Sequence, residues 1–574
     1  MKILKFLLKW IVSIVTFIIK EVFSFFIKGT LFLLIILILV GLVLKETKDV
    51  KKVSKPGTVV QLEINGEYPE GNDVLPSIFS TQNENFYSVI TKLDAIAEDK
   101  NVKGLFVKIN NSEFSNGQLE ELGEKIAFVK SKGKEVITYT DTLTNKSYLL
   151  ALNGNKIYMP PTQAADINLT GYYSELAYYK GLADRLGVQF NVIHVGDYKS
   201  FGENYTKGKM SKEYKENITS LKDAVYNNFI EKISTSRGIL TDEVNNKILS
   251  GMFVNGDINK LLENKFIDKL ITEDEIIKDI GKENIISFTE YDKKEEIKNS
   301  KNKIAIFYLN GEIYTDNSKN GDLTNSITPS GVQEKIDQII NNDEIKGVIL
   351  RINSPGGSAL ASNIINSKIQ NLKLKKPVYV SIGDVAASGG YYIASAGDKI
   401  FADKESITGS IGVVSLIPNF QKTLKKLDVN VETIQKGEYA DLYSLTQDFT
   451  EKDREKIYDS SVRVYDEFVN VVAKGRGKTS EYINTIGQGK IWLGEEGKNI
   501  GLVDEIGGLE ATIASFSKDL KLENYQIIEV SGKAKIDKIL KRNIPFLNLY
   551  YKAENLININ ELYFKPLYYF PYDI

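Results

Sequence analysis

The sequence predicts an α/β protein in which one domain is duplicated in tandem and a transmembrane helix precedes the two copies. Three observations predict this architecture. The chain of 574 residues exceeds what one hydrophobic core usually supports. Segments recur at a constant spacing, and each copy alternates strand-like with helix-like patterns. An uncharged apolar run stands near the N-terminus.

The first 45 residues have the pattern of a membrane attachment. Residues 1–21 intersperse lysines with apolar side chains, as in an amphipathic segment on an anionic membrane surface. The run from Gly29 to Leu44 is too short alone, so the predicted transmembrane anchor spans 22–45, with Lys28 reaching toward the headgroups. No cleavage motif of small residues follows Leu44, so we expect the anchor to be retained. The lysines after the span leave its orientation open.

Three pairs of matching segments indicate the duplication. The pairs are "VVQLEINGEYPEG" from Val59 with "IAIFYLNGEIYTDN" from Ile304, "VKGLFVKINNS" from Val102 with "IKGVILRINSPGG" from Ile345, and "YLLALNGNKIYM" from Tyr148 with "YYIASAGDKIFA" from Tyr391. The offset stays near 243 residues. A constant offset of this size indicates one long tandem duplication rather than a short solenoid repeat.

The repeats set the expected domain boundaries. The N-terminal copy is expected over 56–291 and the C-terminal copy over 304–531, with a charged linker over 292–303. Residues 532–574 form an aromatic-rich tail. This tail is predicted to be either a membrane or subunit contact or a last strand that packs on the body.

Within each copy, strand and helix patterns alternate. The segments from Gly104 to Ile109 and from Gly347 to Ile352 are β-rich, whereas those from Gly331 to Asn341 and from Ala359 to Leu372 suit helices. Alternating strands and helices favour a mainly parallel sheet with crossover helices on its faces.

Composition narrows the chemistry. The chain has no cysteine and one histidine, which excludes thiolate nucleophiles and a multi-histidine zinc site. The net charge of -2 gives no support to a nucleic-acid partner. Any catalysis therefore uses hydroxyl, carboxylate, lysine or backbone groups, and we expect no metal or organic cofactor.

Two glycine-containing turns follow neighbouring strands of the second copy. One is Ser354-Pro355-Gly356-Gly357, and the other is Ala387-Ser388-Gly389-Gly390, which follows a strand over Val378 to Ile382. Tandem glycines at a strand-to-helix turn let backbone N–H groups approach a ligand. Two such turns side by side favour an oxyanion hole around Ser388, although each alone is equally a plain tight turn.

The duplication supplies an internal comparison between the copies. The first copy has Asn145 at the position of Ser388, and it lacks the glycine turn after its matching strand. Conversely, "VGDYKSFGEN" matches "KGEYADLYSL", so that Lys199 stands opposite Ala440. One copy has the serine and the other has the lysine. This asymmetry predicts a Ser388-Lys199 dyad across the copies, because a desolvated lysine with a lowered pKa serves as a general base.

These residues resemble signal peptide peptidase A, the long, double-domain form of protease IV. The matching elements are "NSPGG", "AASGGYYIA", "TGSIGV" and "GDYKS", and the resemblance extends from the membrane span to about Ser531. It implies a Clp protease/crotonase-like fold for each copy, with Ser388 as nucleophile and Lys199 as base. Short relatives have the lysine in a "GEYKD"-like segment, where this chain has "GEYAD", as the long form would.

The resemblance also implies the other site residues. Ser410, in "TGSIG", would orient the lysine amine, although a serine between glycines is often a turn residue. The N–H groups of Gly389 and of Gly356 or Gly357 would hold the oxyanion. His194 invites a triad with Lys199, but we expect it to be a strand residue satisfied locally.

The activity implied by the resemblance is hydrolysis of apolar peptides, chiefly cleaved signal peptides, by a membrane-anchored serine endopeptidase. It also implies a homotetramer on the bacterial inner membrane, with its body on the periplasmic side and in contact with membrane lipid. Two alternatives stay open. One is a crotonase-like acyl-thioester enzyme, which needs no serine-lysine pair, and the other is an inactive membrane scaffold.

Overall fold

The computed structural model describes residues 51–71, 84–292, 300–318 and 326–531, together with Lys28 and the strand at 567–569. The predicted amphipathic segment lies outside the described residues, as does the predicted anchor except for Lys28. Among the described residues, no helix combines the length and the apolar character needed to span a bilayer.

The chain divides into two compact units. One consists of Met1–Ser54 and Ile286–Asp292, and the other of Lys55–Ile285 and Lys293–Ile574. In the described part of the first unit, Lys52 forms a parallel bridge with Tyr291, and its amine lies 2.7 Å from Glu290 Oε2. The second unit contains almost all of both predicted repeats, so the two copies fold together rather than as separate bodies.

The first repeat contains nine strands within the described residues. They are β1 (Thr58–Asn65), β2 (Val102–Asn111), β3 (Glu135–Tyr139), β4 (Thr142–Thr144), β5 (Lys156–Met159), β6 (Asp166–Asn168), β7 (Gln189–Val195), β8 (Lys269–Leu270) and β9 (Ile285–Ser287). Its helices are α2 (Phe86–Glu98), α3 (Asn116–Ser131), α4 (Asn145–Ala151), α5 (Lys180–Leu186), α6 (Glu203–Thr206), α7 (Lys212–Arg237), α8 (Thr241–Leu249), α9 (Ile258–Glu263), α10 (Glu273–Ile280) and the 3₁₀ turn η1 (Lys282–Asn284).

The second repeat has the same kind of content. Its strands are β10 (Lys303–Asn310), β11 (Glu312–Ile313), β12 (Ser326–Ile327), β13 (Ile345–Ser354), β14 (Gly356–Ser358), β15 (Val378–Ala387), β16 (Lys399–Ala402), β17 (Ile407–Gly409), β18 (Val413–Asn419), β19 (Ile491–Leu493), β20 (Glu505–Ile506) and β21 (Gln526–Val530), with β22 (Leu567–Tyr569) from the tail. Its helices are α11 (Pro329–Ile340), α12 (Ala359–Lys373), α13 (Gly389–Ala394), α14 (Gln421–Lys426), α15 (Glu451–Arg476), α16 (Ser480–Ile486), α17 (Gly494–Asn499) and α18 (Leu509–Asp519).

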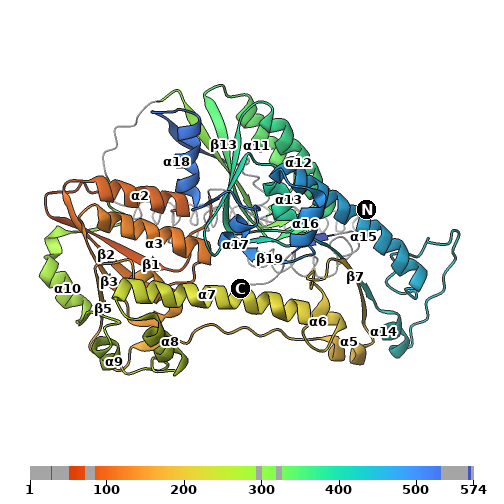
Figure 1. The fold of residues 1–574 in the computed structure, drawn as a ribbon, viewed down its shortest axis with the longest axis horizontal. Coiled ribbons are helices and arrows are strands. Elements are labelled where there is room, and N and C mark those ends of the chain that lie inside the picture. Colours follow the sequence, from red (N-terminus) through yellow and green to blue (C-terminus); the bar gives the residue numbers. More distant parts are fainter. Residues whose placement is uncertain are drawn as a thin grey trace, which may run out of the picture. The chain divides into compact units, whose positions relative to one another are not determined.

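Each repeat is built on a mainly parallel sheet. The order is β8-β5-β3-β2-β1 in the first repeat and β19-β17-β15-β13-β10-β21 in the second, where only the β17-β19 pair is antiparallel. In the second repeat, α18 covers one face of the sheet, and α11 and α12 cover the other (Figure 1). Both faces of the central strands are therefore buried, which explains the nearly continuous apolar run in β13.

The register of the strands confirms the duplication. β1 pairs with β2 from Thr58↔Val102, and the next pair, Val59↔Gly104, leaves one residue of β2 unpaired. β10 pairs with β13 from Lys303↔Ile345, with one residue of β13 unpaired at the same place. The long helices also correspond, because α7 and α15 each have 26 residues and each ends at a glycine in the left-handed conformation, Gly238 and Gly477.

A further sheet joins the two repeats. Its order is β12-β11-β14-β22-β18-β7, and β7 of the first repeat pairs antiparallel with β18 of the second from Val195↔Val413 to Gln189↔Asn419. The sequence did not predict this sheet, because pairing between distant segments leaves no local pattern. Because of this pairing, the residues that follow β7 in the first repeat lie next to the strand ends of the second repeat's main sheet.

Several predicted segments need adjustment. β15 continues past Ile382 to Ala387, and α13 begins at Gly389, within the predicted turn. Gly356 and Gly357 lie in the short strand β14 rather than in a simple turn. Residues 293–299 of the expected linker lie outside the described residues, and Lys303 already belongs to β10. Within the tail, residues 567–569 form β22, which packs on the body.

Candidate active site

Three neighbouring strands of the second repeat end at the same edge of its sheet. β13 pairs with β15 up to Ser354↔Ala386, and β15 pairs with β17 up to Ala387↔Gly409. Because all three strands are parallel, the residues that follow them meet at one edge. This edge therefore brings together the Ser354 to Gly357 segment, Ser388 and Ser410.

Ser388 lies at the junction between β15 and α13 in a strained conformation. Its φ is 54° and its ψ is -117°, a combination that L-residues rarely adopt. Its N–H donates to Gly409 O at 2.8 Å, and its carbonyl accepts from Tyr392 N–H at 2.9 Å. The side chain is fully buried. Backbone strain of this kind often accompanies a residue that has to present its side chain in one direction.

Lys199 reaches Ser388 from the first repeat. It lies four residues after Val195, where β7 ends its pairing with β18. Its Nζ lies 2.7 Å from Ser388 Oγ, 2.9 Å from Ser410 Oγ and 3.0 Å from Ser410 O. The structure thus brings together Lys199, Ser388 and Ser410, three residues that the sequence analysis selected from both halves of the chain.

Burial controls the charge of this amine. Lys199 is 2% exposed, and desolvation lowers the pKa of its amine well below the usual range of lysine. Its three hydrogen-bond neighbours are all uncharged oxygens of Ser388 and Ser410. The lowered pKa favours the uncharged form of this amine, which lies next to the Ser388 hydroxyl.

The glycine segment after β13 lies against the start of α13. A Cβ added to Gly390 would lie 2.5 Å from Ser354 O, so only glycine permits this contact. Gly356 N–H donates to Ser354 Oγ at 3.2 Å. Gly357 has a φ of 150°, and a Cβ there would lie 2.2 Å from Ile313 O on β11. Gly389 is the first residue of α13 and is buried.

The sequence did not predict the role of residues 487–490, a segment that packs against the backbone of Lys199. Tyr198 N–H donates to Gln488 O at 2.8 Å, and Ser410 N–H donates to Lys490 O at 2.7 Å. A Cβ on Gly489 would lie 2.5 Å from Lys199 N. The only signal in the sequence is "GQGK" before the strand "IWL", which by itself is an ordinary turn.

The residues at the matching positions of the opposite repeat have other surroundings than the site residues. Asn145, opposite Ser388, donates from Nδ2 to Gly171 O at 2.6 Å. Ala440, opposite Lys199, is exposed on the surface. His194 lies in β7, is exposed, and has its Nδ1 3.0 Å from Gly196 O, so it takes no part in the Lys199-Ser388 contact.

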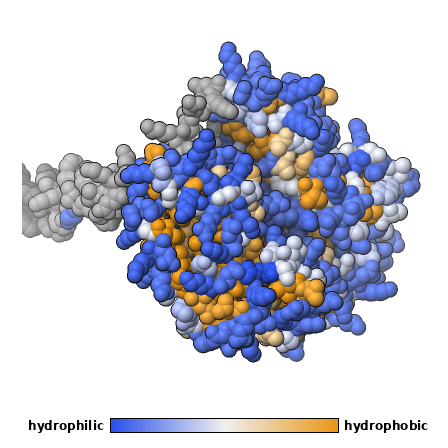
Figure 2. Space-filling view, turned by 60° about the vertical axis from the view of Figure 1, so that its left-hand side comes forward, coloured by the Kyte–Doolittle hydropathy of each residue, from blue (hydrophilic) through white to orange (hydrophobic). Residues whose placement is uncertain are grey.

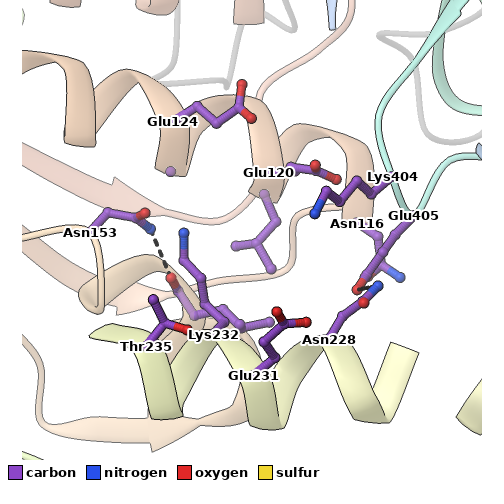
Figure 3. A pocket seen from close by; sticks show the side chains of 13 residues that line it. Asn116, Glu120, Glu124, Asn153, Asn228, Glu231, Lys232, Thr235, Lys404 and Glu405 are labelled. Atoms are coloured by element: carbon purple, nitrogen blue, oxygen red, sulfur yellow. Dashed lines mark hydrogen bonds between the residues drawn. The ribbon is translucent and has the colours of Figure 1, made fainter. Parts of the chain in front are cut away.

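A cavity of about 300 Å³ lies at another junction of the repeats (Figure 3). It is lined by side chains of α3 and α7 and by Lys404 and Glu405. Asn228 donates to Glu405 Oε1 at 3.1 Å, and burial raises the pKa of both Glu120 and Glu405 to about 7. None of the predicted site residues lines this cavity. In the described part of the chain, no group of histidine and carboxylate side chains has the geometry of a metal site.

A serine at a strand-to-helix turn beside a buried amine is the arrangement of a hydrolase with an activated nucleophile. The sequence matches the family model "Peptidase family S49" twice, over residues 129–286 and 370–523. Each match falls inside one repeat. The chain belongs to peptidase family S49.

The chain is also similar to individual proteins that are named as proteases or peptidases. The chain is 32% identical to "Protease 4" of Haemophilus influenzae over 473 residues, which cover 79% of this chain and 74% of that protein. It is 29% identical to "Serine protease SPPA, chloroplastic" of Arabidopsis thaliana over 480 residues, covering 80% and 69%. A "Putative signal peptide peptidase SppA" of Enterococcus faecium is 35% identical over 231 residues, covering 40% and 67%. The resemblance to the long form of protease IV is confirmed, and a serine protease function is supported.

Proposed function

We propose that this protein is a serine endopeptidase in which Ser388 is the nucleophile and Lys199 the general base. The observation that carries the proposal is the 2.7 Å contact between Lys199 Nζ and Ser388 Oγ. The amine is buried and its pKa is lowered, which favours the neutral form that a base requires. The internal asymmetry of the duplication adds support, because each repeat supplies one of the two groups.

The proton path follows from the three contacts of the amine. Its two N–H groups donate to Ser410 O and Ser410 Oγ, which leaves the lone pair directed at the Ser388 hydroxyl. As Ser388 Oγ bonds to the substrate carbonyl carbon, Lys199 takes the hydroxyl proton. The ammonium then gives that proton to the leaving amine as the C–N bond breaks, and water hydrolyses the ester in a second cycle. In this scheme Ser410 orients the amine.

The carbonyl oxygen of the substrate becomes an oxyanion and needs donors. We assign this role to the backbone N–H of Gly389 and to that of Gly356 or Gly357; Gly356 N–H would first have to leave Ser354 Oγ. The first N–H groups of a helix have no partner within the helix, which suits Gly389 at the start of α13. The contact between Gly390 and Ser354 O keeps the glycine segment beside this helix. Donors fixed in this way stabilise a developing negative charge without reorganisation.

The strand β14, which holds these glycines, is paired on one side with β11 and on the other with β22. β22, from the tail of this chain, pairs antiparallel with β14 through Gly356↔Tyr569, Gly357↔Tyr568 and Ser358↔Leu567. An edge that accepts one strand through main-chain hydrogen bonds accepts another of similar shape. We propose that a peptide substrate pairs with β14 at this place, next to Ser388.

We further propose that the substrates are apolar peptides, chiefly cleaved signal peptides, and that the enzyme works as a homotetramer anchored in the bacterial inner membrane, with its body on the periplasmic side. Apolar side chains are exposed where α5 and α14 lie together, among them Leu182, Leu186 and Leu427. Figure 2 shows, for one face of the protein, hydrophobic residues gathered into patches on a largely hydrophilic surface. Such surfaces suit a second copy of the chain or a membrane.

We also propose a fold for each repeat and a mechanism without a cofactor. A serine at a strand-to-helix turn, flanked by a glycine segment after the neighbouring strand, fits a Clp protease/crotonase-like domain in each repeat. The mechanism uses only groups of the chain, so the active enzyme would need no metal or organic cofactor.

The test uses the full chain in detergent. A fluorophosphonate probe should label the wild type at Ser388, and an apolar peptide should be hydrolysed. Ser388→Ala should abolish labelling, and both Ser388→Ala and Lys199→Ala should reduce turnover by roughly a thousandfold or more. Undiminished hydrolysis by Ser388→Ala would exclude the proposed nucleophile. Labelling of the wild type also distinguishes a serine hydrolase from a crotonase-like enzyme. Hydrolysis by the wild type that is lost in Ser388→Ala distinguishes the enzyme from an inactive scaffold.

A further inference from the structure

A buried cluster of charges links the two repeats near the candidate active site, on a strand that ends there. Arg351 on β13 of the second repeat is fully buried, and it contacts Glu70 and Glu121 of the first repeat. The side chains of these two glutamates are only 7% and 6% exposed. Buried charges of this kind are stable only when each is paired and hydrogen-bonded.

Every N–H group of Arg351 has an acceptor. Nε donates to Glu70 Oε2 at 3.1 Å, and Nη2 donates to Glu70 Oε1 at 2.9 Å and to Glu121 Oε1. Nη1 donates to Ser381 Oγ at 2.9 Å and to Ile382 O at 3.3 Å. Five donors thus meet five acceptors, which a rigid guanidinium satisfies and a lysine ammonium with three donors does not.

Arg351 and two of its five acceptors lie on strands that end at the site. Arg351 is on β13, three residues before Ser354, and Ser381 and Ile382 are on β15, which ends next to Ser388. Arg351 therefore fixes the two strands whose ends carry the glycine segment and the nucleophile. Asn353 Oδ1 adds a second link by accepting from Val385 N–H at 3.2 Å.

Glu121 in turn belongs to a helix that packs the first repeat against the second. Glu121 lies on α3, and its Oε2 accepts from Leu509 N–H at 2.9 Å, at the start of α18. A Cβ on Gly117, also on α3, would lie 2.8 Å from Gly383 O on β15. The first repeat thus contacts β15 directly, five residues before Ser388.

Among the residues that the structure describes, this cluster occurs once, although the domain is duplicated. By the alignment of the repeats, Lys108 stands at the position of Arg351, Thr315 at that of Glu70, and Ile364 at that of Glu121. Lys108 instead forms a partly exposed pair with Glu273 at 2.7 Å. Like the Ser388-Lys199 contact, the cluster therefore takes its members from both repeats and is present only on the side that carries the candidate site.

We propose that Arg351, held by Glu70 and Glu121, is a positioning residue for the peptidase site, setting the distance between the oxyanion glycines and Ser388. This inference rests on the proposed function. It makes the docking of the first repeat a condition for the geometry of the second repeat's site. A small displacement of such groups costs much in rate, because catalysis depends on their alignment in the transition state.

The test compares Arg351→Lys with Lys108→Arg, the same exchange at the matching position of the other repeat, in the full chain. Rates are expressed per site labelled by the fluorophosphonate probe, so that unfolded protein does not count. We expect Arg351→Lys to lower kcat per labelled site by roughly 10- to 100-fold with KM changed by less than about threefold. Lys108→Arg should leave both constants unchanged.

A purely structural role predicts a different result. Arg351→Lys would then reduce Tm or the fraction of labelled sites, while kcat per labelled site stayed at the wild-type value, and the inference would be overturned. If Arg351→Lys does not fold, Ser381→Ala removes one acceptor only, and an unchanged kcat per labelled site in that variant would equally overturn it. Turnover by Ser388→Ala would instead defeat the proposed function, so the two failures are distinguishable.

Discussion

Gly489 lies directly against the backbone of Lys199. A Cβ at position 489 would lie 2.5 Å from Lys199 N and 2.6 Å from its Cβ, and the φ of Gly489 is 79°. Glycine is therefore required here for two reasons, the left-handed conformation and the close contact. The residue touches no substrate in the proposed mechanism, yet it sets where the lysine amine lies.

Gly489→Ala should consequently lower kcat by roughly tenfold or more, because the backbone of Lys199 has to move away from Ser388. Gly133→Ala is the matched control, since Gly133 has the same φ of 79° and nothing within 4 Å of the added Cβ. Peptide hydrolysis measured on both variants separates crowding of Lys199 from conformational strain. Equal kcat values in the two variants would contradict the prediction.

The pH dependence of the reaction should report the titration of Lys199. The base works only when neutral, so kcat/KM should rise as pH increases through the pKa of Lys199 and then level off. Burial lowers that pKa, so the rise should occur well below the pH at which a free lysine loses its proton. A plot of log kcat/KM against pH should have a limiting slope of about one. A rate that falls as pH rises through the neutral range would argue against a neutral lysine base.

Lys199→Met should stabilise the protein in a pH-dependent manner. The folded state holds the amine with a lowered pKa, so it binds fewer protons than the unfolded state at pH values between the folded and the unfolded pKa. This costs stability that grows as pH falls from the unfolded pKa toward the folded one and stays constant below it. The gain in Tm from Lys199→Met should therefore be larger at neutral pH than at about pH 10. Thermal unfolding at several pH values checks this, and a gain independent of pH would refute it.

Ser410→Ala should weaken catalysis without removing it. The variant loses the hydroxyl that lies 2.9 Å from Lys199 Nζ but keeps the backbone carbonyl at 3.0 Å. We expect kcat to fall by roughly 10- to 100-fold, because the amine keeps one of its two acceptors. Ser415→Ala is a suitable control, since Ser415 is also buried and its hydroxyl has no hydrogen-bond partner among the described residues. Similar kcat values in both variants would remove the orienting role from Ser410.

Deleting residues 567–574 should increase the rate at low substrate concentration. β22 pairs with the edge of β14 that we assign to the substrate, so the two strands compete. The deletion should lower KM for a peptide and leave kcat nearly unchanged, because the groups that react are untouched. Steady-state kinetics of the shortened and complete chains give both constants. A higher KM after deletion would mean that β22 supports peptide binding rather than competing with it.

Much of the fold could be predicted from the sequence because it rests on local patterns. The apolar run of β13 and the helical pattern of α12 define elements that the structure places within one or two residues. The offset between repeats added information that local patterns lack, since it marked Ser388 and Lys199 as residues present in one copy only. The sheet that joins β7 to β18 left no such trace, because antiparallel pairing of segments more than 200 residues apart depends on the packing of the whole unit.

By itself, the sequence determined the chemical types at the site: a serine between small residues, a lysine in the other repeat, and glycines where the backbone approaches closely. Only the tertiary structure decided that the lysine amine lies within hydrogen-bond distance of the serine, with Gly489 against its backbone. It alone also revealed Arg351 between Glu70 and Glu121. The physical reason is that the sequence gives the identity of each side chain directly. Burial arises only when distant segments pack together, and the lowered pKa of Lys199 depends on that burial.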